Sequence, residues 1–255
     1  TTKAKENSRL SFLNSNSNTF VRTPKSLLNR ALKSYWRSKS IVKDLFTNKI
    51  DIYHGLSHEL PLGIEKTSIK SVVTIHDLIF IRYPHLFSTI DRKIYFKKFK
   101  SACERAYKII AISQQTKQDI IDFLEIPESK ITVVYQGCNN IFQKPIAKSK
   151  KEETLKKYNI PTEYLLNVGS IEERKNLLTL LQALKELPNQ KLVVIGNGKS
   201  YKIKCLRYIK EHNLSGRVMF LSNLTLEEMA VIYQSAELMI YPSIYLLVIK
   251  TPSAS

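Results

Sequence analysis

Short apolar runs that alternate with amphipathic helical patterns constrain the fold of this chain more than any other feature. Four such runs, rich in β-branched or aliphatic residues, occur in the first half, at 50–54, 71–75, 108–112 and 131–135. Runs without polar alternation are typical of strands that are buried on both faces of a parallel sheet. Helical patterns lie between them, at 24–46, 88–106 and 113–124. Ser113 is the expected N-cap of the last helix.

A second series with the same alternation fills the C-terminal half. Its expected strands are 164–168, 191–195, 217–221 and 237–241. A helix over 176–187 is predicted by four leucines at i, i+3, i+4 and i+7, which would form one apolar face. A helix over 225–236 is predicted to begin with a capping box, because Thr225 is followed three residues later by Glu228.

Strand, helix and strand repeated in this way predict an α/β protein with two Rossmann-like, doubly wound domains. A charged segment without strand character at 143–161 is the expected connection between them. We therefore expect an N-terminal domain over 1–145 and a C-terminal domain over 146–255.

The charge of the chain is strongly positive, at a formal +18, and half of this excess lies in residues 1–50, which hold 11 Lys/Arg against 2 Asp/Glu. A solvated basic segment and an anionic membrane surface are both compatible with it. Three scattered cysteines form neither a disulfide framework nor a metal-ligand spacing, which fits a reducing compartment. We expect a cytoplasmic protein, either with a solvated basic segment or peripheral at the inner face of a membrane.

Ligands of such sheets bind in loops after the carboxyl ends of the strands. The most informative of these loops is in NVGSIEERKN, over 167–176. Gly169 ends a strand there, and Arg174 and Lys175 stand at the expected start of the next helix. Two cations beside free backbone N–H groups can hold a phosphate. An ordinary βα turn with two solvated basic residues is the alternative.

Three other strand ends carry weaker signals. His76 and Asp77 follow the strand at 71–75, where a histidine could contact substrate or transfer a proton, although a hydrogen-bonded turn explains the pair equally well. His54 and Gly55 close the first strand, within HGLSHELPLG. Gly196 opens a small glycine turn, GNGKS, which lacks the spacing of a phosphate-binding loop.

Taken in order, six segments resemble glycosyltransferase family 4, a set of retaining enzymes with the GT-B fold. They are HGLSHELP, VVTIHDL, AISQQTKQDI, VGSIEERKNL, VIGNG and YPS, and together they run from about Asp51 to Ser243. The resemblance implies transfer of a mannose-like or glucose-like hexose from a nucleotide sugar, such as a GDP- or UDP-hexose, to a glycan or lipid-linked acceptor. It also implies that no cofactor or metal is needed.

The resemblance assigns roles to residues at the strand ends. Arg174 and Lys175 match the cations that stabilise the leaving diphosphate, and His76 matches a histidine close to the transferred sugar, so these three are the expected catalytic residues. Gly169 and Gly196 match the donor side. The expected acceptor-side residues are His54, Gly55 and Asp77.

Two segments depart from the family pattern. Residues 1–49 do not match the first strand and glycine-rich loop of the family, so we expect an N-terminal domain without them. After YPS the family continues with an acidic Glu-Gly-Phe-Gly stretch, whereas this chain reads IYLLVIKTPSAS. We therefore expect a C-terminal domain that is truncated after about residue 243 and impaired in catalysis.

Two alternatives to an active enzyme remain open. One is a non-catalytic remnant or partner subunit of the same fold that binds glycan or protein. The other is a basic protein that binds nucleic acid or an anionic surface because of its net charge, and a steep dependence of DNA binding on salt would distinguish it.

Overall fold

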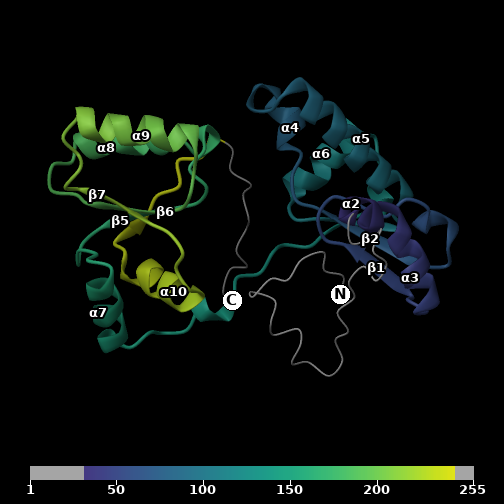
Figure 1. Ribbon diagram of the computed structural model, residues 1–255, viewed down its shortest axis with the longest axis horizontal. Helices are drawn as coiled ribbons and strands as arrows, with labels where there is room; N and C mark the ends of the chain where they lie inside the picture. Colours follow the sequence, from purple (N-terminus) through teal and green to yellow (C-terminus); the bar gives the residue numbers. More distant parts are fainter. Residues whose placement is uncertain (1–31, 245–255) are drawn as a thin grey trace. The chain divides into compact units, whose positions relative to one another are not determined.

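The computed structural model describes residues 32–244, which divide into two compact units on either side of Gln136 and Gly137 (Figure 1). The N-terminal unit comprises residues 32–136 and the C-terminal unit residues 137–244. This division lies nine residues before the boundary expected at 145 and 146. The reason is that the intervening segment packs on the C-terminal unit, where Gln234 Nε2 donates to the carbonyl oxygen of Lys144 at 2.8 Å.

A parallel sheet of four strands forms the centre of the N-terminal unit. Its strands are adjacent in chain order: β1 (Ile52–Gly55), β2 (Lys70–Ile75), β3 (Lys108–Ala111) and β4 (Ile131–Val133). All three pairings are parallel, and Gly55 lies opposite Val73, which lies opposite Ile109. The carboxyl ends of the strands therefore meet along one edge of the sheet, as the apolar runs predict.

The longer helices of this unit are α5 and α6, both expected from the sequence. α5 (Thr89–Arg105) and α6 (Gln114–Leu124) follow β2 and β3, and Ser113 caps α6 by accepting a hydrogen bond from the N–H of Thr116. The shorter elements are α2 (Lys33–Tyr35), α3 (Ile41–Thr47), α4 (Ile79–Arg82), η3 (Ile64–Lys66), η4 (Pro84–Leu86) and η5 (Glu128–Lys130).

Residues 24–31 of the helix expected over 24–46 lie outside the described residues, and the described part is helical from Lys33 onward. It contains a π-helical turn, η2 (Trp36–Ser40), between α2 and α3. The indole of Trp36 is 1% exposed, and its Nε1 donates to Asp44 Oδ2 at 2.9 Å. Buried tryptophans ordinarily find such a partner for the indole N–H.

The C-terminal unit also contains a four-stranded parallel sheet, but its strands are not adjacent in chain order. The order across the sheet is β7 (Val218–Leu221), β6 (Leu192–Ile195), β5 (Leu165–Val168) and β8 (Leu238–Met239). From β5 the chain passes to β6 and β7 on one side and then returns to place β8 on the other.

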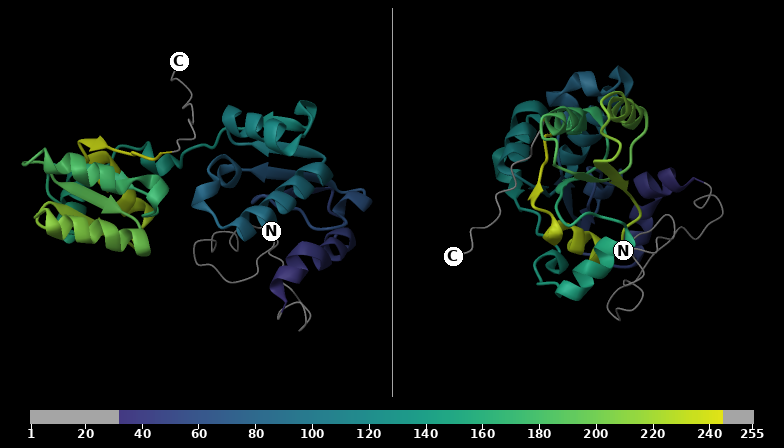
Figure 2. Two further views of the ribbon diagram at one scale, coloured as in Figure 1. Left: turned by 90° about the horizontal axis from the view of Figure 1, so that it is seen from above. Right: turned by 90° about the vertical axis from the view of Figure 1, so that its left-hand side faces the viewer.

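Helices cover both faces of this second sheet, so the predicted doubly wound arrangement is confirmed here. α8 (Leu177–Lys185) and α9 (Ser200–Glu211) lie together on one face, and α7 (Lys148–Lys157) and α10 (Leu226–Ser235) lie together on the other (Figures 1 and 2). Each face has a separate apolar core, one that includes the four leucines of α8 and another around Tyr164 and Ile232. The predicted capping box of α10, between Thr225 and Glu228, is present.

Two helices of this unit were not expected from the sequence. α7 lies within the charged connecting segment, where lysine and glutamate are good helix formers and pair along the helix, as Lys150 and Glu153 do at 2.9 Å. α9 follows the glycine turn after β6. In the described part of the chain, no helix is both long and apolar enough to cross a membrane.

All three cysteines are free thiols. Cys103 and Cys205 are buried in the cores of the two units, and burial raises the pKa of both thiols, to about 12 for Cys103. Cys138 is exposed and lies two residues after Gln136.

Candidate functional site

The strand order of the C-terminal unit reverses at β5, and this reversal locates the candidate donor site. The loop after β5 belongs to a connection that runs to one side of the sheet, and β8 enters from the other side. In open α/β sheets, a crevice at the carboxyl ends of the strands forms at such a point and is where ligands bind. Arg174 and Lys175 lie in the loop after β5, and Tyr241 and Ser243 lie in the segment after β8.

Glycines allow the loops after β5 and β6 to approach each other closely. A Cβ atom on Gly196 would lie 1.8 Å from the carbonyl oxygen of Gly169, and one on Gly198 would lie 2.3 Å from that of Ile171. Gly169 has φ +151° and its N–H donates to the carbonyl oxygen of Ile195 at 2.9 Å. Side chains at 196 and 198 are therefore excluded, and backbone lines this part of the site.

Arg174 and Lys175 lie just before helix α8, in the 3₁₀ turn η7 (Glu173–Lys175). The helix expected to start near Lys175 and Asn176 is present as α8, which begins one residue later, at Leu177, because Asn176 adopts the left-handed conformation (φ +57°). Asparagine tolerates this conformation better than most residues. The N–H of Leu178 donates to the hydroxyl of Tyr201 at 3.0 Å, so not every N–H of the first turn is open to a ligand.

The segment after β8 is attached to the two cations of this turn. The carbonyl oxygen of Arg174 accepts hydrogen bonds from Ser243 Oγ at 3.1 Å and from the N–H of Ile244 at 2.9 Å. Lys175 Nζ lies 4.5 Å from the ring centroid of Tyr241, a cation–π distance. The segment after β8 therefore fixes the backbone of this turn through Ser243 and Ile244, and it positions the ammonium group of Lys175 through the ring of Tyr241.

The guanidinium of Arg174 is directed by a neighbouring carboxylate. Its Nε donates to Glu172 Oε2 at 3.0 Å, and within residues 32–244 this is the only hydrogen bond its side chain makes. The two terminal nitrogens of the guanidinium therefore keep their N–H donors for a ligand. A guanidinium that projects two N–H groups in one plane suits bidentate binding of phosphate.

A second group of predicted residues gathers at the carboxyl end of β1 and β2 in the N-terminal unit. His54 Nε2 and Thr74 Oγ1 are 2.8 Å apart across the two strands. Gly55 ends β1, and a Cβ atom there would lie 2.1 Å from the carbonyl oxygen of Glu59. The absence of a side chain at Gly55 thus lets the loop after β1 fold back over the strand end.

His76 lies directly after β2 and is hydrogen-bonded through both ring nitrogens. Nε2 is 2.9 Å from the carbonyl oxygen of Leu56, and Nδ1 is 3.4 Å from Gln136 Nε2. A carbonyl oxygen only accepts, so Nε2 carries the proton and Nδ1 accepts from the amide of Gln136. The ring is half-buried, and these two bonds fix both its tautomer and its orientation.

His58 contacts His76 and helps to fix its position. It was not predicted as a site residue. Its Nδ1 accepts a hydrogen bond from the N–H of His76 at 3.4 Å, and its ring stacks on Phe99 with centroids 4.3 Å apart. Burial, together with the charges of His76 and Lys98, lowers the pKa of His58 to about 4, so its ring is neutral. His58 also has φ +59°, an uncommon backbone conformation for a non-glycine residue.

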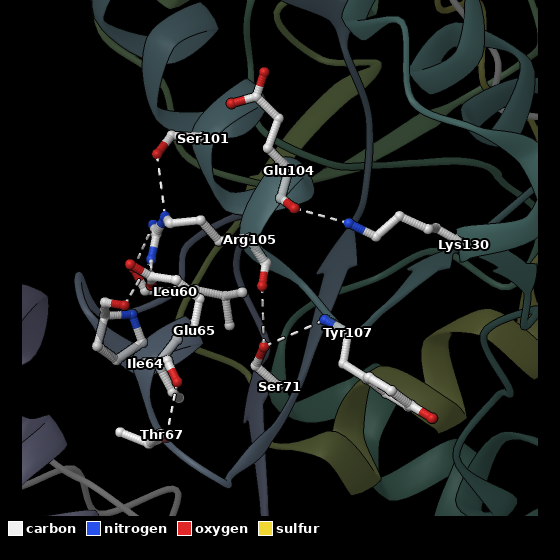
Figure 3. Close-up of polar contacts among 11 residues, drawn as sticks. Leu60, Ile64, Glu65, Thr67, Ser71, Ser101, Glu104, Arg105, Tyr107 and Lys130 are labelled. Carbon is white, nitrogen blue, oxygen red and sulfur yellow. Dashed lines mark hydrogen bonds and ion pairs between the residues drawn. The ribbon is translucent and has the colours of Figure 1, made fainter.

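The loop that carries His58 is anchored to the end of α5 by Arg105 (Figure 3). Its guanidinium donates to the carbonyl oxygens of Pro61 at 2.7 Å and Leu60 at 3.2 Å, and it pairs with the carboxylate of Glu65 at 3.4 Å. The loop is thus held at its far end by charge-assisted hydrogen bonds and at its near end by the backbone approach at Gly55.

Asp77 has a local structural role. Its Oδ1 accepts a hydrogen bond from the N–H of Ile79 at 3.2 Å, which begins α4. This is the hydrogen-bonded turn that was the alternative for the His76–Asp77 pair. Over residues 32–244, histidine, cysteine and carboxylate side chains do not gather in a group that could hold a metal ion.

The structure thus brings the predicted residues together in two places, each within one unit: His54, Gly55, His76 and Asp77 in the first, and Gly169, Arg174, Lys175 and Gly196 in the second. Sequence reasoning missed His58, Gln136, Glu172 and the attachment of Tyr241 and Ser243 to the cationic turn. His58 lies within HGLSHELPLG, and the YPS segment is one of the six that carry the resemblance. The contact of His58 with His76 and that of Ser243 with Arg174 cannot be predicted from their spacing in the sequence.

Comparison with known proteins gives a consistent result for both halves of the chain. Residues 4–140 match the profile of Glycosyltransferase Family 4, and residues 150–247 match that of Glycosyl transferases group 1. The chain is 27% identical over 202 residues to the serotype-specific mannosyltransferase WbdA of Escherichia coli, an alignment that covers 75% of this chain and 25% of that protein.

Two further curated relatives are also mannosyltransferases by name. The O-antigen chain mannosyltransferase B of Escherichia coli is 27% identical, with 76% of this chain and 51% of that protein covered. The O-antigen chain mannosyltransferase RfbU of Salmonella typhimurium is 25% identical, with 83% and 54% covered. The chain therefore spans about a quarter to half of the length of these relatives.

Solved structures agree in fold at low sequence identity. HepE of Anabaena in complex with UDP-glucose superposes with a TM-score of 0.69 at 16% identity, over 95% of this chain and 65% of that one. A glycosyltransferase from Rickettsia africae gives a TM-score of 0.66 at 18% identity, over 94% and 63%. These neighbours have the GT-B fold of two Rossmann-like domains. Because the Glycosyltransferase Family 4 profile matches residues 4–140, which is more than half of the chain, the chain belongs to that family.

Proposed function

We propose that this protein transfers a hexose from a nucleotide-sugar donor to a glycan or lipid-linked acceptor, with retention of configuration and without a metal ion. The observation that carries the proposal is the pair of cations, Arg174 and Lys175, at the strand-order reversal of the C-terminal unit. Curated relatives are named as mannosyltransferases of O-antigen chains, which favours a mannose-like sugar. A structural neighbour holds UDP-glucose, which keeps a glucose-like donor as the second candidate.

The proposed role of the cations follows from the charge that develops during the reaction. As the bond between the anomeric carbon and the diphosphate oxygen breaks, negative charge accumulates on the diphosphate and the sugar becomes positively charged. Preorganised cations at the diphosphate stabilise this state, and removing one such group typically costs about 3–4 kcal/mol of activation free energy. The terminal nitrogens of Arg174 and the ammonium group of Lys175 would supply this stabilisation.

The bond-forming step balances without a protein nucleophile. The oxygen of the acceptor hydroxyl bonds to the anomeric carbon on the face that the diphosphate leaves. The hydroxyl proton passes to the departing phosphate oxygen. His76 would lie near the transferred sugar. Its Nδ1 accepts a hydrogen bond from the amide of Gln136 at 3.4 Å, and a sugar hydroxyl could replace that amide as the donor. We place the acceptor near His54 and Gly55, and the protein at the inner face of a membrane.

Calorimetric titration tests the donor site directly. The unmodified chain is titrated with GDP-mannose and with UDP-glucose, each with and without EDTA. We expect saturable binding of one of them that EDTA does not change. Each of the substitutions Arg174→Ala and Lys175→Ala should weaken that binding about tenfold to a hundredfold, since a hydrogen bond to a charged group contributes ~1.5–3 kcal/mol.

Lys185→Ala is the matched control because Lys185 lies in the last turn of α8, at the opposite end of that helix from the cationic turn. It should bind as the unmodified chain does. Equal affinities for the control and for the two site variants would contradict the assignment. Binding that EDTA abolishes would contradict the metal-independent mechanism.

A further inference from the structure

A groove between α4 and the first half of α5 lies in the N-terminal unit, apart from the histidine site. Its volume is about 400 Å³, within the range of about 300–1,000 Å³ that is common for small-ligand pockets. The α5 residues that line it recur at i, i+3, i+4, i+7 and i+8 and so come from one face of that helix. Phe80 closes the groove from α4, which packs beside α5 (Figure 1), and Pro84 closes it from η4.

The groove combines apolar and cationic side chains. Phe80 is 3% exposed and, with Phe96, provides an aromatic floor. The three charged residues of the lining are all basic: Arg92, Lys93 and Lys97. An apolar floor beside three cations matches a ligand that has an anionic head and a hydrocarbon body.

These cations differ from their neighbours on the same helix because no carboxylate pairs with them. Lys98 pairs with Glu59 at 3.0 Å, and Lys100 pairs with Glu125 at 2.9 Å. No ion pair involves the three groove cations within residues 32–244, and Arg92 Nε is buried there without a hydrogen-bond partner. The carboxylate of Asp91, next in sequence, accepts from Ser88 Oγ at 2.7 Å. A buried N–H donor without a partner is costly, so an anion in the groove would be stabilised.

Aliphatic side chains continue the apolar character onto the exposed surface of α5. Ile90 is 72% exposed and Ile94 is 54% exposed, one helical turn apart and adjacent in sequence to Asp91 and Lys93. Burying these two isoleucines in a lipid layer would add to the attraction between the nearby lysines and anionic headgroups. Isoleucine can neither stack on a base nor hydrogen-bond, so this edge does not favour nucleic acid.

We infer that the groove between α4 and α5 binds an anionic phospholipid of a membrane surface, with its phosphate on Arg92, Lys93 and Lys97 and its acyl chain against Phe80 and Phe96. Ile90 and Ile94 enter the same lipid layer. This inference rests on the membrane location in the proposed function and names the surface that would contact the membrane. The groove shares no residue with the donor site. Vesicle binding without a nucleotide sugar therefore fails or succeeds independently of donor binding.

Co-sedimentation of the full chain with vesicles tests the inference. Vesicles of phosphatidylcholine alone are compared with vesicles that also contain phosphatidylglycerol, and binding should require the anionic lipid. The double variant Lys93→Glu/Lys97→Glu should bind at least about thirtyfold more weakly, from the contribution of single basic residues near an anionic surface. The control Lys43→Glu/Lys66→Glu makes the same change of net charge at exposed positions of the same unit. Its affinity for anionic vesicles should fall far less.

A second pair of variants tests the apolar part. Ile90→Asn/Ile94→Asn should weaken vesicle binding, whereas Ile203→Asn/Leu206→Asn, at exposed positions of α9, should not. All eight positions are exposed, so the variants should fold, which circular dichroism verifies. The inference is overturned if the unmodified chain ignores anionic vesicles or if both charge-reversal pairs lose binding equally. It is also overturned if the isoleucine pair binds normally or if inorganic phosphate alone displaces the protein from vesicles.

Discussion

In the C-terminal unit the strand order turns back at β5, whereas in the N-terminal unit the described strands follow one another from β1 to β4. Both sheets are parallel and both place loops at one edge, so the difference lies in what those loops do. At the reversal, the loops after β5 and β6 approach each other through glycines, and the loop after β5 presents two cations that the segment after β8 contacts. Beside β2, by contrast, the neutral ring of His58 packs between Phe99 and the ring of His76.

The comparison shows how one architecture supports two kinds of chemistry. A strand-order reversal leaves a crevice that suits a charged ligand, because backbone N–H groups and side-chain cations can converge on it. Consecutive strands bring their loops into direct contact, which suits side chains that fix each other's orientation. Each of the following experiments alters one of the two units, and the other unit remains unchanged as the reference.

The largest effect is expected where two loops of the C-terminal unit touch. Gly196→Ala should lower the free energy of unfolding by about 3 kcal/mol, because the new Cβ would meet the carbonyl oxygen of Gly169 and a well-packed site resists such insertion. Gly216→Ala is the control, since nothing lies within 4 Å of a Cβ there. Urea unfolding followed by circular dichroism measures both. Equal stabilities would show that the approach of the two loops is not tight.

The neutral ring of His58 should make the N-terminal unit sensitive to mild acid. His58 has a folded pKa of about 4 against an ordinary value of 6.5, so between these values the unfolded chain binds more protons. Its stabilising contribution is full above pH 6.5 and is lost as the pH falls to about 4, by roughly 2–3 kcal/mol.

Trp36 is the single tryptophan and is buried in this unit, so its fluorescence reports on urea unfolding there. His58→Gln keeps a hydrogen-bond acceptor and removes the titration, so its stability should vary less over this pH range. A variant with the same pH dependence as the unmodified chain would exclude His58 as the source.

The C-terminal unit should respond at lower pH. Hydrogen bonds from Lys157, from the N–H of Thr225 and from Tyr158 lower the pKa of Glu228 from 4.5 to about 2. The stabilisation is therefore complete above pH 4.5 and is lost as the pH falls from 4.5 towards 2. Glu228→Gln should remove this dependence and cost about 1 kcal/mol at neutral pH, the usual contribution of a helix cap.

Hydrogen exchange of amides in β5 and β6 measures this change within the unit. Glu227→Gln, one residue earlier and exposed, is the control and should leave both stability and its acid dependence unchanged. Loss of the acid dependence in the control variant would point to general charge effects in α10.

The smallest effect is expected at the carboxylate beside Arg174. Glu172→Gln should strengthen the binding of a nucleoside diphosphate about fivefold, because it removes a negative charge next to the phosphate and releases Arg174 Nε, a change of about 1 kcal/mol. Glu173→Gln is the control, since that carboxylate lies 3.8 Å from Lys204 instead. Calorimetry compares the two, and an equal change in both would assign the effect to overall charge.

Much of the fold could be predicted because its signals are local. Apolar runs located both ends of all eight strands to within two residues, and caps at Ser113 and Thr225 fixed two helix starts. α8 begins one residue after the expected position, because Asn176 adopts the left-handed conformation, which depends on the loops around it. α7 was missed because its stability rests on ion pairs and on packing against α10.

The chemistry of the candidate site was predictable in residue type but not in arrangement. Histidine and paired cations after strands could be recognised, since the carboxyl ends of parallel strands share one edge. The hydrogen bond from His76 to His58 joins residues 18 apart, and that from Ser243 to Arg174 joins residues 69 apart. Such contacts depend on strand order, which spacing along the chain does not encode.

The three cysteines differ enough in environment to give a practical handle on the protein. A maleimide reacts with the thiolate, so burial and a raised pKa protect Cys103 and Cys205 in the native state. Cys138 is exposed and lies two residues from Gln136, where one unit ends and the next begins. A single fluorophore can therefore be attached at the junction of the unmodified chain, where its polarisation would report how that junction responds when a nucleotide sugar or a vesicle is added.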